Sequence, residues 1–281
     1  MVLNAQMKSL DNPFFVFNNA LNKNIKPQPW LDQATLLKNL GFDGMEGRET
    51  KGFLEAIKTF KAKGLKFYTN YVKIDIDQEQ PYEKEWQQVL PKLEGSNLIL
   101  WAHIHSKKYK PSNTEADNII VPILQELLDL AEPYGVRIAI YPHVDFLAEK
   151  VEDSFRLASK ANRENIGSVF NLCHFLKTDK AENLEKAINH TFTKLFAVSI
   201  CGADSGDTQN MGWDRLIQPL GSGTFDVYRL VEMLKDKGYK GPIGLQCYDI
   251  KTPPELHLKQ SRETWETYKQ KYTNNNYQLK N

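Results

Sequence analysis

The feature that most constrains this chain is an alternation of two kinds of segment from one end to the other. Short segments rich in β-branched and aromatic residues alternate with longer segments whose apolar residues recur every three or four positions. Eight short segments occur, at 14–19, 42–46, 65–72, 97–105, 136–143, 167–174, 195–202 and 242–249. We expect strands there, with amphipathic helices between them, among others at 120–131, 148–161 and 225–237.

The repeat of strand and helix favours one closed barrel. Strands that alternate with helices pair in parallel through right-handed crossovers, and eight such units favour a (β/α)8 barrel over an open doubly wound sheet. No Gly-x-Gly-x-x-Gly motif follows the first strand, which weakens the dinucleotide-binding alternative. No Pro- or Ser-rich linker divides the 281 residues, and only the tail from about residue 272 looks loose. The sequence therefore predicts an α/β fold, with residues 1–281 in a single TIM-barrel domain.

The charge and the apolar pattern weigh against two classes of partner. The 36 basic and 35 acidic residues are interspersed and leave a net charge of +1, so nothing favours nucleic acid. The longest apolar runs are far shorter than the ~20 residues that span a bilayer, and no signal peptide is apparent. We expect a cytoplasmic protein without a membrane partner, or a secreted or periplasmic one if the sequence has been trimmed. A homo-oligomer is compatible with these data.

The cysteines do not predict a disulfide framework. Cys173, Cys201 and Cys247 are an odd set without Cys-x-x-Cys spacing, which also argues against a structural zinc site. We expect them to be free thiols.

Polar residues end several of the expected strands. In (β/α)8 barrels the working residues lie at the carboxyl ends of the strands and in the loops that follow. Tyr141, Asn171, Ser199 and Gln246 each come two positions after a small or β-branched residue of the same strand. That alternation suits a crowded barrel interior. We expect these four side chains to lie at a similar depth and to face a common centre.

Four motifs spread over the chain carry a family resemblance. They are GFDGMEG at the second strand, GVRIAIYPHVDF at the fifth, GSVFNLCHF at the sixth and PLGSGTFDVYRLVEMLKDKGYKGPIGLQ leading into the eighth. With them the chain resembles, over nearly its whole length, the xylose-isomerase-like barrel superfamily of sugar isomerases, sugar-phosphate isomerase/epimerases and hydroxypyruvate-isomerase-like proteins. The resemblance implies a small carbohydrate ligand.

The same resemblance implies a divalent cation, held by Glu on strand five, Asp on strand six, His on strand seven and Glu on strand eight. The two Glu residues also act as the acid/base pair. The corresponding positions here are Tyr141, Asn171, Ser199 and Gln246. Because a hard dication needs anionic oxygens, and these side chains are neutral, we expect no metal ligands and no metal cofactor. The family's histidines that contact substrate oxygens correspond to His143 and His174.

Three residues are candidates for catalysis and eight for substrate binding. The catalytic candidates are Glu46, His143 and His174, because carboxylates and imidazoles at a barrel mouth serve as general acids and bases. The substrate-binding candidates offer hydrogen bonds or aromatic faces to a sugar: Trp101, His103, His105, Tyr141, Asn171, Ser199, Gln246 and Tyr248. Tyr71 offers a further aromatic face at a strand end.

These candidates have structural alternatives. Glu46 suits a salt bridge or a helix cap as well as a general base. The histidines at neighbouring strand ends suit a sugar pocket or packing at the barrel top, and a zinc site rebuilt from them is the less favoured option. Tyr141 also suits the space that a metal occupies in the family, and Trp101 and Tyr248 suit packing at the barrel rim.

Two functions from different classes follow. The first is an isomerase or epimerase that acts on a small sugar, sugar phosphate or sugar acid without the usual divalent metal. The second is a non-catalytic carbohydrate-binding barrel descended from such enzymes. The loop at 201–223 is long for a compact domain, so we expect it to cover the site.

Overall fold

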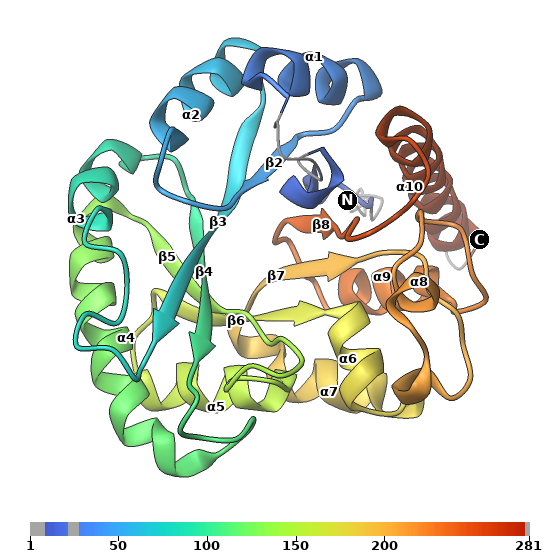
Figure 1. Ribbon diagram of the computed structural model, residues 1–281. Helices are drawn as coiled ribbons and strands as arrows, with labels where there is room; N and C mark the ends of the chain where they lie inside the picture. Colours follow the sequence, from blue (N-terminus) through green and yellow to red (C-terminus); the bar gives the residue numbers. More distant parts are fainter. Residues whose placement is uncertain (1–8, 22–27, 279–281) are drawn as a thin grey trace, which may run out of the picture.

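A computed structural model describes residues 9–21 and 28–278. Its eight strands close into a barrel in sequence order, and every neighbouring pair is parallel (Figure 1). The strands are β1 (Phe14–Val16), β2 (Gly44–Gly47), β3 (Lys66–Asp75), β4 (Ile99–His105), β5 (Arg137–Ile140), β6 (Ile166–Asn171), β7 (Leu195–Ile200) and β8 (Ile243–Leu245). The (β/α)8 barrel expected from the sequence is confirmed.

The helices form a ring outside the strands (Figure 1). They are α1 (Trp30–Leu40), α2 (Phe53–Ala62), α3 (Trp86–Val89), α4 (Asp117–Ala131), α5 (Val151–Ala161), α6 (Leu172–Thr178), α7 (Leu184–Thr191), α8 (Trp213–Leu216), α9 (Val227–Asp236) and α10 (Pro254–Gln278). Within the described residues no helix is long and apolar enough to cross a membrane. As expected, the three cysteines form no disulfide, and all three are buried.

Several strands end earlier than the sequence predicts, whereas β2 and β3 end later. Asn18 begins a short 3-10 helix, residues 141–143 follow β5, residues 172–174 begin α6 and residues 246–249 follow β8. The backbone N–H groups of Cys247 and Tyr248 donate to the side-chain oxygen of Gln246 instead of to a neighbouring strand. By contrast β3 runs on to Asp75, because its pairing with β4 continues to that residue. Side-chain acceptors thus end β8, and cross-strand pairing extends β3.

Residues 272–278 belong to a helix, where the sequence suggests the start of a loose tail. α10 continues to Gln278, and the Tyr272 hydroxyl donates to Asp236 Oδ1 over 3.0 Å. Trp265 of the same helix stacks on Phe14 of β1, with ring centroids 4.4 Å apart. Burial of these aromatic side chains against the barrel holds a helix whose own sequence is mostly polar.

Aromatic side chains fill the interior of the barrel. Phe15, Phe17 and Trp101 pack there together with small residues such as Ala139 and Ala197. A Cβ atom on Gly244 would lie 2.6 Å from both phenylalanine rings, so glycine is needed where β8 passes β1. The interior is therefore a packed core that forms the floor beneath the mouth.

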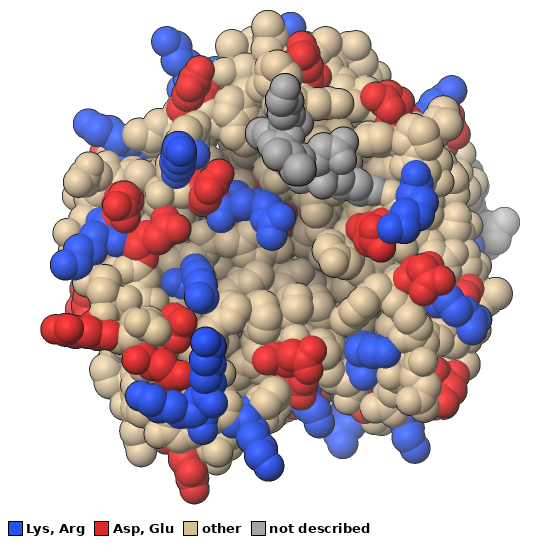
Figure 2. All heavy atoms as spheres, viewed as in Figure 1, with Lys and Arg blue, Asp and Glu red and all other residues tan. Residues whose placement is uncertain are grey.

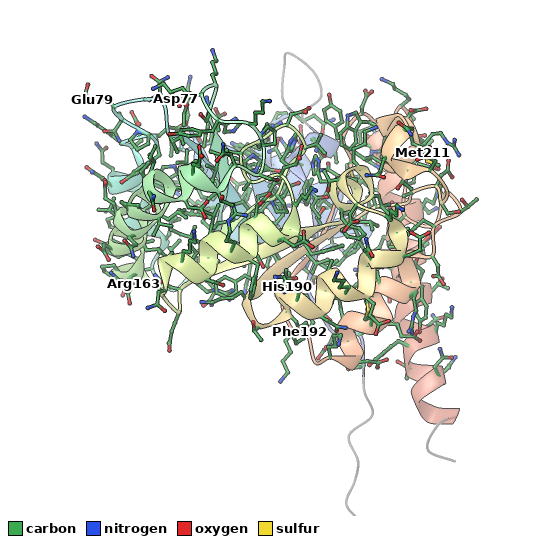
Figure 3. All side chains as sticks on the ribbon, turned by 90° about the horizontal axis from the view of Figure 1, so that it is seen from below. Asp77, Glu79, Arg163, His190, Phe192 and Met211 are labelled. Carbon is green, nitrogen blue, oxygen red and sulfur yellow. The ribbon has the colours of Figure 1, made fainter. Side chains whose placement is uncertain are left out.

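The strands place their carboxyl ends on one face. Asp77, Glu79 and Met211, which follow strands, lie toward one end of the molecule in Figure 3, and Arg163, His190 and Phe192, which precede strands, lie toward the other. Figures 1 and 2 view the molecule from the carboxyl ends, and the space-filling view is hollowed near the centre of that face.

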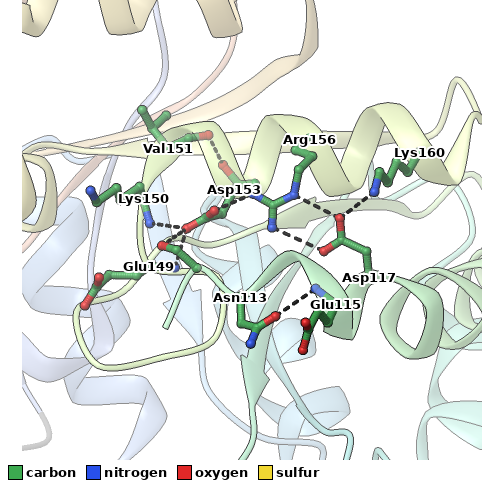
Figure 4. A network of polar contacts seen from close by, with 11 residues as sticks. Asn113, Glu115, Asp117, Glu149, Lys150, Val151, Asp153, Arg156 and Lys160 are labelled. Carbon is green, nitrogen blue, oxygen red and sulfur yellow. Dashed lines mark hydrogen bonds and ion pairs between the residues drawn. The ribbon is translucent and has the colours of Figure 1, made fainter. Parts of the chain in front are cut away.

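A buried ionic network fixes the loop between β5 and α5 (Figure 4). Arg156 joins Asp153 and Asp117 through hydrogen bonds of 2.5–3.2 Å, and both carboxylates are almost fully buried. Asp153 also accepts hydrogen bonds from the backbone N–H groups of Glu149 and Lys150. The loop that precedes α5 is therefore anchored at its end, which positions its earlier residues at the barrel mouth.

Candidate functional site

A cavity of about 320 Å³ opens at the carboxyl ends of the strands. Seven of the residues predicted from the sequence line it: Tyr71, His103, Tyr141, His143, His174, Gln246 and Tyr248. The expectation of a polar and aromatic pocket at the barrel mouth therefore agrees with the structure.

The other predicted residues lie outside the lining. Trp101 is buried in the barrel interior between Phe17 and Tyr141, so it forms part of the floor. Asn171 and Ser199 are also fully buried, and they are paired across β6 and β7. His105 packs against Phe146, with ring centroids 4.0 Å apart.

Several lining residues were not predicted. Arg48 comes two residues after Glu46, and Trp213 comes from the loop at 201–223, which agrees with its expected role as a cover. The rule that loops after strands carry the site would have included both. Val144 also lines the cavity. It acts through its backbone groups, and no signal in the sequence marks an apolar residue for such a role.

The backbone of Val144 fixes two adjacent histidines in opposite tautomers. His143 Nδ1 lies 2.6 Å from the Val144 carbonyl oxygen, and because a carbonyl only accepts, Nδ1 carries the proton. The Val144 N–H donates to His174 Nδ1 over 3.3 Å, so the proton of that ring is on Nε2. The ring centroids are 4.0 Å apart. His143 thus keeps a basic Nε2, whereas His174 has a donor Nε2–H.

Burial keeps these imidazoles neutral. It lowers the pKa of His103, His143 and His174, and for His103 and His174 the proximity of His143 lowers it further. Neutral rings have both a proton donor and a proton acceptor near pH 7. The pocket therefore holds two neutral imidazoles, one with an unprotonated Nε2 and one with an Nε2–H.

Glu46 lies behind Tyr71 and not in the cavity lining. Its side chain is 1% exposed, and Oε2 accepts a hydrogen bond of 3.0 Å from the backbone N–H of Asn18. No described residue makes a hydrogen bond of good geometry to Oε1, although the Tyr71 hydroxyl faces the carboxyl closely enough to favour its ionised form. Burial nevertheless raises the pKa of Glu46 from its ordinary value of 4.5 to about 8.

The side chains at the positions that the resemblance assigns to the metal ligands are uncharged, and their hydrogen bonds are made within the protein. Gln246 Oε1 already accepts hydrogen bonds from Asn19 Nδ2 and from the N–H groups of Cys247 and Tyr248. Asn171 donates through Nδ2 to the Tyr141 hydroxyl and accepts from Cys173 Sγ through Oδ1. These oxygens are neutral and engaged, whereas Mg²⁺ or Mn²⁺ requires free anionic oxygens.

The histidines do not supply a replacement set. Within residues 9–21 and 28–278, no three His, Cys, Asp or Glu side chains are grouped so that they could hold a metal ion. The rings of His103 and His143 are 6.3 Å apart between centroids, and those of His103 and His105 are 6.4 Å apart.

Solved structures share the whole barrel. The structure is similar to that of an L-ribulose 3-epimerase, with a TM-score of 0.74 and 13% identity over 95% of this chain and 97% of that one. It is also similar to the IOLI protein with a bound zinc atom, with a TM-score of 0.71 and 20% identity over 92% and 99% of the two chains. At these identities the similarity shows the fold.

Curated relatives are similar in sequence at low identity. The inosose isomerase of Halalkalibacterium halodurans is 22% identical over 263 residues, which are 85% of this chain and 90% of the relative. The inosose isomerase of Bacillus licheniformis is 28% identical over 153 residues, 53% of this chain and 52% of the relative, so that match spans about half of each. A model of the xylose isomerase-like TIM barrel family matches residues 34–268, in agreement with the resemblance found in the sequence motifs. This chain belongs to the xylose isomerase-like TIM barrel family.

Proposed function

We propose that the protein binds a small sugar or sugar acid in the mouth cavity and moves a proton between or at its carbon atoms, as an isomerase or epimerase. The observation that carries the proposal is the pair of neutral imidazoles, His143 and His174, held in opposite tautomers by Val144. One ring offers a base and the other a hydrogen-bond donor, which is the minimum that an enolisation requires.

The proposed reaction begins at His143. Its Nε2 accepts the proton of a carbon atom next to the ligand carbonyl, while the Nε2–H of His174 donates to a neighbouring ligand oxygen and fixes its position. Return of the proton from His143 to the adjacent carbon isomerises the sugar, and return to the same carbon, after the intermediate has turned its other face toward His143, epimerises it. Tyr248 and Trp213 offer aromatic faces at the edge of the cavity.

The proposal does not use the family's divalent cation. Two observations support a mechanism without the cation. Gln246 Oε1 already accepts three hydrogen bonds, and the Asn171 side-chain amide is bonded to the Tyr141 hydroxyl. The names of the relatives support the substrate class, since they are inosose isomerases and a sugar epimerase.

The test follows hydrogen exchange in D2O by NMR, with inosose, L-ribulose, D-tagatose and D-allulose as probes. We expect one of them to exchange a carbon-bound hydrogen in the EDTA-treated protein at the same rate as in the untreated protein, with no gain from added Mn²⁺ or Zn²⁺. His143→Ala should lower the rate by roughly 10²–10⁴-fold, the usual contribution of a general base. The matched control is His190→Ala, because His190 lies on α7 at the opposite end of the barrel.

Three outcomes decide between the alternatives. Exchange that is abolished by EDTA and restored by Mn²⁺ contradicts the metal-independent mechanism. Thermal stabilisation by a sugar without exchange supports the non-catalytic carbohydrate-binding barrel. Neither stabilisation nor exchange with any of these probes contradicts the proposed substrate class.

A further inference from the structure

The proposed histidine chemistry does not use the buried carboxyl of Glu46, which lies next to the cavity-lining Tyr71. It is fully buried, and only one of its two oxygens receives a hydrogen bond of good geometry from the described residues. A buried carboxyl with an unsatisfied oxygen costs on the order of 1–3 kcal/mol, and carboxyls in such surroundings are concentrated at functional sites.

Tyr71 separates this carboxyl from the cavity. Its ring lines the pocket and packs edge-on against His103, with centroids 4.0 Å apart, and against Tyr141 at 5.7 Å. Its hydroxyl interacts both with Glu46 and with the Tyr141 hydroxyl. The Arg48 guanidinium lies over the other side of the ring, 5.7 Å from the centroid. Packing thus holds Tyr71 between the carboxyl and the cavity.

We propose that Tyr71 and Glu46 form a proton relay, in which the Tyr71 hydroxyl exchanges a proton with a ligand oxygen and the Glu46 carboxyl restores it. Tyr71 is then the catalytic residue that touches the ligand, and Glu46 is a positioning residue that stores the proton. The relay rests on the proposed function, to which it adds the group that protonates the ligand carbonyl.

The protons and electrons balance without a further reactant. His143 takes the carbon-bound proton, and the pair of that C–H bond forms a C=C bond. The carbonyl π pair takes the proton of Tyr71, which takes the proton of Glu46, so the products are an enediol, an imidazolium and a carboxylate. Return of the imidazolium proton to carbon, and of a hydroxyl proton through Tyr71 to Glu46, restores both groups.

Charged and titratable neighbours favour this direction of transfer. The groups that face Glu46 are Tyr71 from β3, Arg48 from the loop after β2 and Tyr141 from the end of β5. Burial raises the pKa of both tyrosines well above the usual value, so their hydroxyls stay protonated. Arg48 stabilises the carboxylate once it forms and lowers the pKa of Glu46. The carboxyl is the proton store and the phenol only passes the proton.

The first experiment follows the protonated carboxyl by infrared difference spectroscopy against pH, without any ligand. We expect a carboxylic-acid band that persists at pH 7, is lost as the pH rises through about 8 and is absent from Glu46→Gln. Tyr71→Phe should move this transition to higher pH, because the hydroxyl that stabilises the carboxylate is removed. Tyr68→Phe, the same substitution on the same strand outside the cavity, should leave it unchanged.

The second experiment measures hydrogen exchange of the sugar that responds in the wild-type protein. Tyr71→Phe and Glu46→Gln should each lower the rate by roughly 10²–10⁴-fold, and the double variant should lose no more than either alone, because the two groups act as a unit. Thermal stabilisation by the sugar should persist, and both substitutions nearly conserve side-chain volume.

The outcomes separate the relay from the proposed function. If Tyr71→Phe exchanges the hydrogen of the sugar at the same rate as the wild type, the relay is overturned and the proposed isomerase function is unaffected. A carboxyl that titrates near 4.5, or a transition that Tyr71→Phe does not move, overturns it as well. An infrared response as expected, without exchange of any sugar, supports the link between the two groups and contradicts the isomerase.

Discussion

At the scale of single residues, the burial of one carboxyl changes how the stability of the protein depends on pH. Glu46 has a pKa of about 8 in the folded protein and an ordinary value of 4.5 in the unfolded chain. Between these two values the unfolded chain has lost the proton and the folded protein still binds it. The contribution of Glu46 to stability therefore falls as the pH rises from about 4.5 to about 8, with a slope on the order of 1.4 kcal/mol per pH unit.

Glu46→Gln should remove this dependence. The amide keeps an oxygen for the Asn18 N–H and does not titrate, so the variant should gain stability over the wild type at pH 8 but not at pH 4.5. Urea unfolding at the two pH values measures the difference. An equal effect of the substitution at both values would show that Glu46 titrates alike in the folded and unfolded chains.

The sequence predicted much of the pocket and missed Tyr71 as a hydroxyl donor for a physical reason. Strict alternation along β3 from Tyr68, which faces the interior, would place Asn70 and not Tyr71 inward. The pairing of β2 with β3 shifts register between Met45 and Glu46, so β3 contains one extra residue and both tyrosines face inward. No local pattern marks that bulge.

At the scale of elements, α4 and α5 are joined by the charges that Figure 4 shows. Burial alone would raise the pKa of Asp117, but the hydrogen bonds from Arg156 and Lys160 outweigh it and lower that pKa. The ion pair between Arg156 and Asp117 is partly shielded from water, since the side chain of Asp117 is only 1% exposed. The attraction between the two charges contributes less to stability than would be lost if one of them were left buried without a partner.

Arg156→Met should destabilise the protein by about 3–5 kcal/mol, because it leaves the buried carboxylate of Asp153 without its cation and that of Asp117 with Lys160 alone. Arg163→Met is the control, since Arg163 pairs with exposed carboxylates and its loss should cost less than about 1 kcal/mol. Chemical unfolding measures both. Equal losses in the two variants would mean that the buried network is no stronger than the surface pairs.

The strand and helix order was predictable because it follows from local periodicity, whereas the ends of the elements were not. α5 begins at Val151, where the carboxylate of Asp153 accepts a hydrogen bond from the backbone N–H of Lys150 and is itself fixed by the ionic network. α10 extends through residue 272 because Trp265 and Tyr272 are buried against the barrel. The end of α10 is therefore set by partners distant in the sequence.

At the scale of the whole molecule, closure of the barrel depends on space around β1. Phe15 is paired with Gly44 on one side and with Gly244 on the other. A side chain at Gly244 would collide with the rings of Phe15 and Phe17. The packing that forms the aromatic floor of the cavity therefore also determines whether β1 and β8 can pair to close the barrel.

Gly244→Ala should destabilise the barrel by about 1–3 kcal/mol through overpacking. Phe15→Leu should relieve part of that loss in the double variant, so the two effects should not add. Phe14→Leu, on the same strand but facing the outer helices, should add to Gly244→Ala without relief. Thermal unfolding of the single and double variants measures the coupling, and additive losses for Phe15→Leu would rule out the proposed collision.

The backbone of one residue, Val144, gives the cavity a direction. Its carbonyl and its N–H contact different imidazoles, so reversing a ligand end for end would set donor against donor at His174 and acceptor against acceptor at His143. A ligand whose two halves are mirror images of each other would therefore still bind in a single orientation. The enantiotopic ends of such a polyol would be distinguished by the two amide groups that flank one residue.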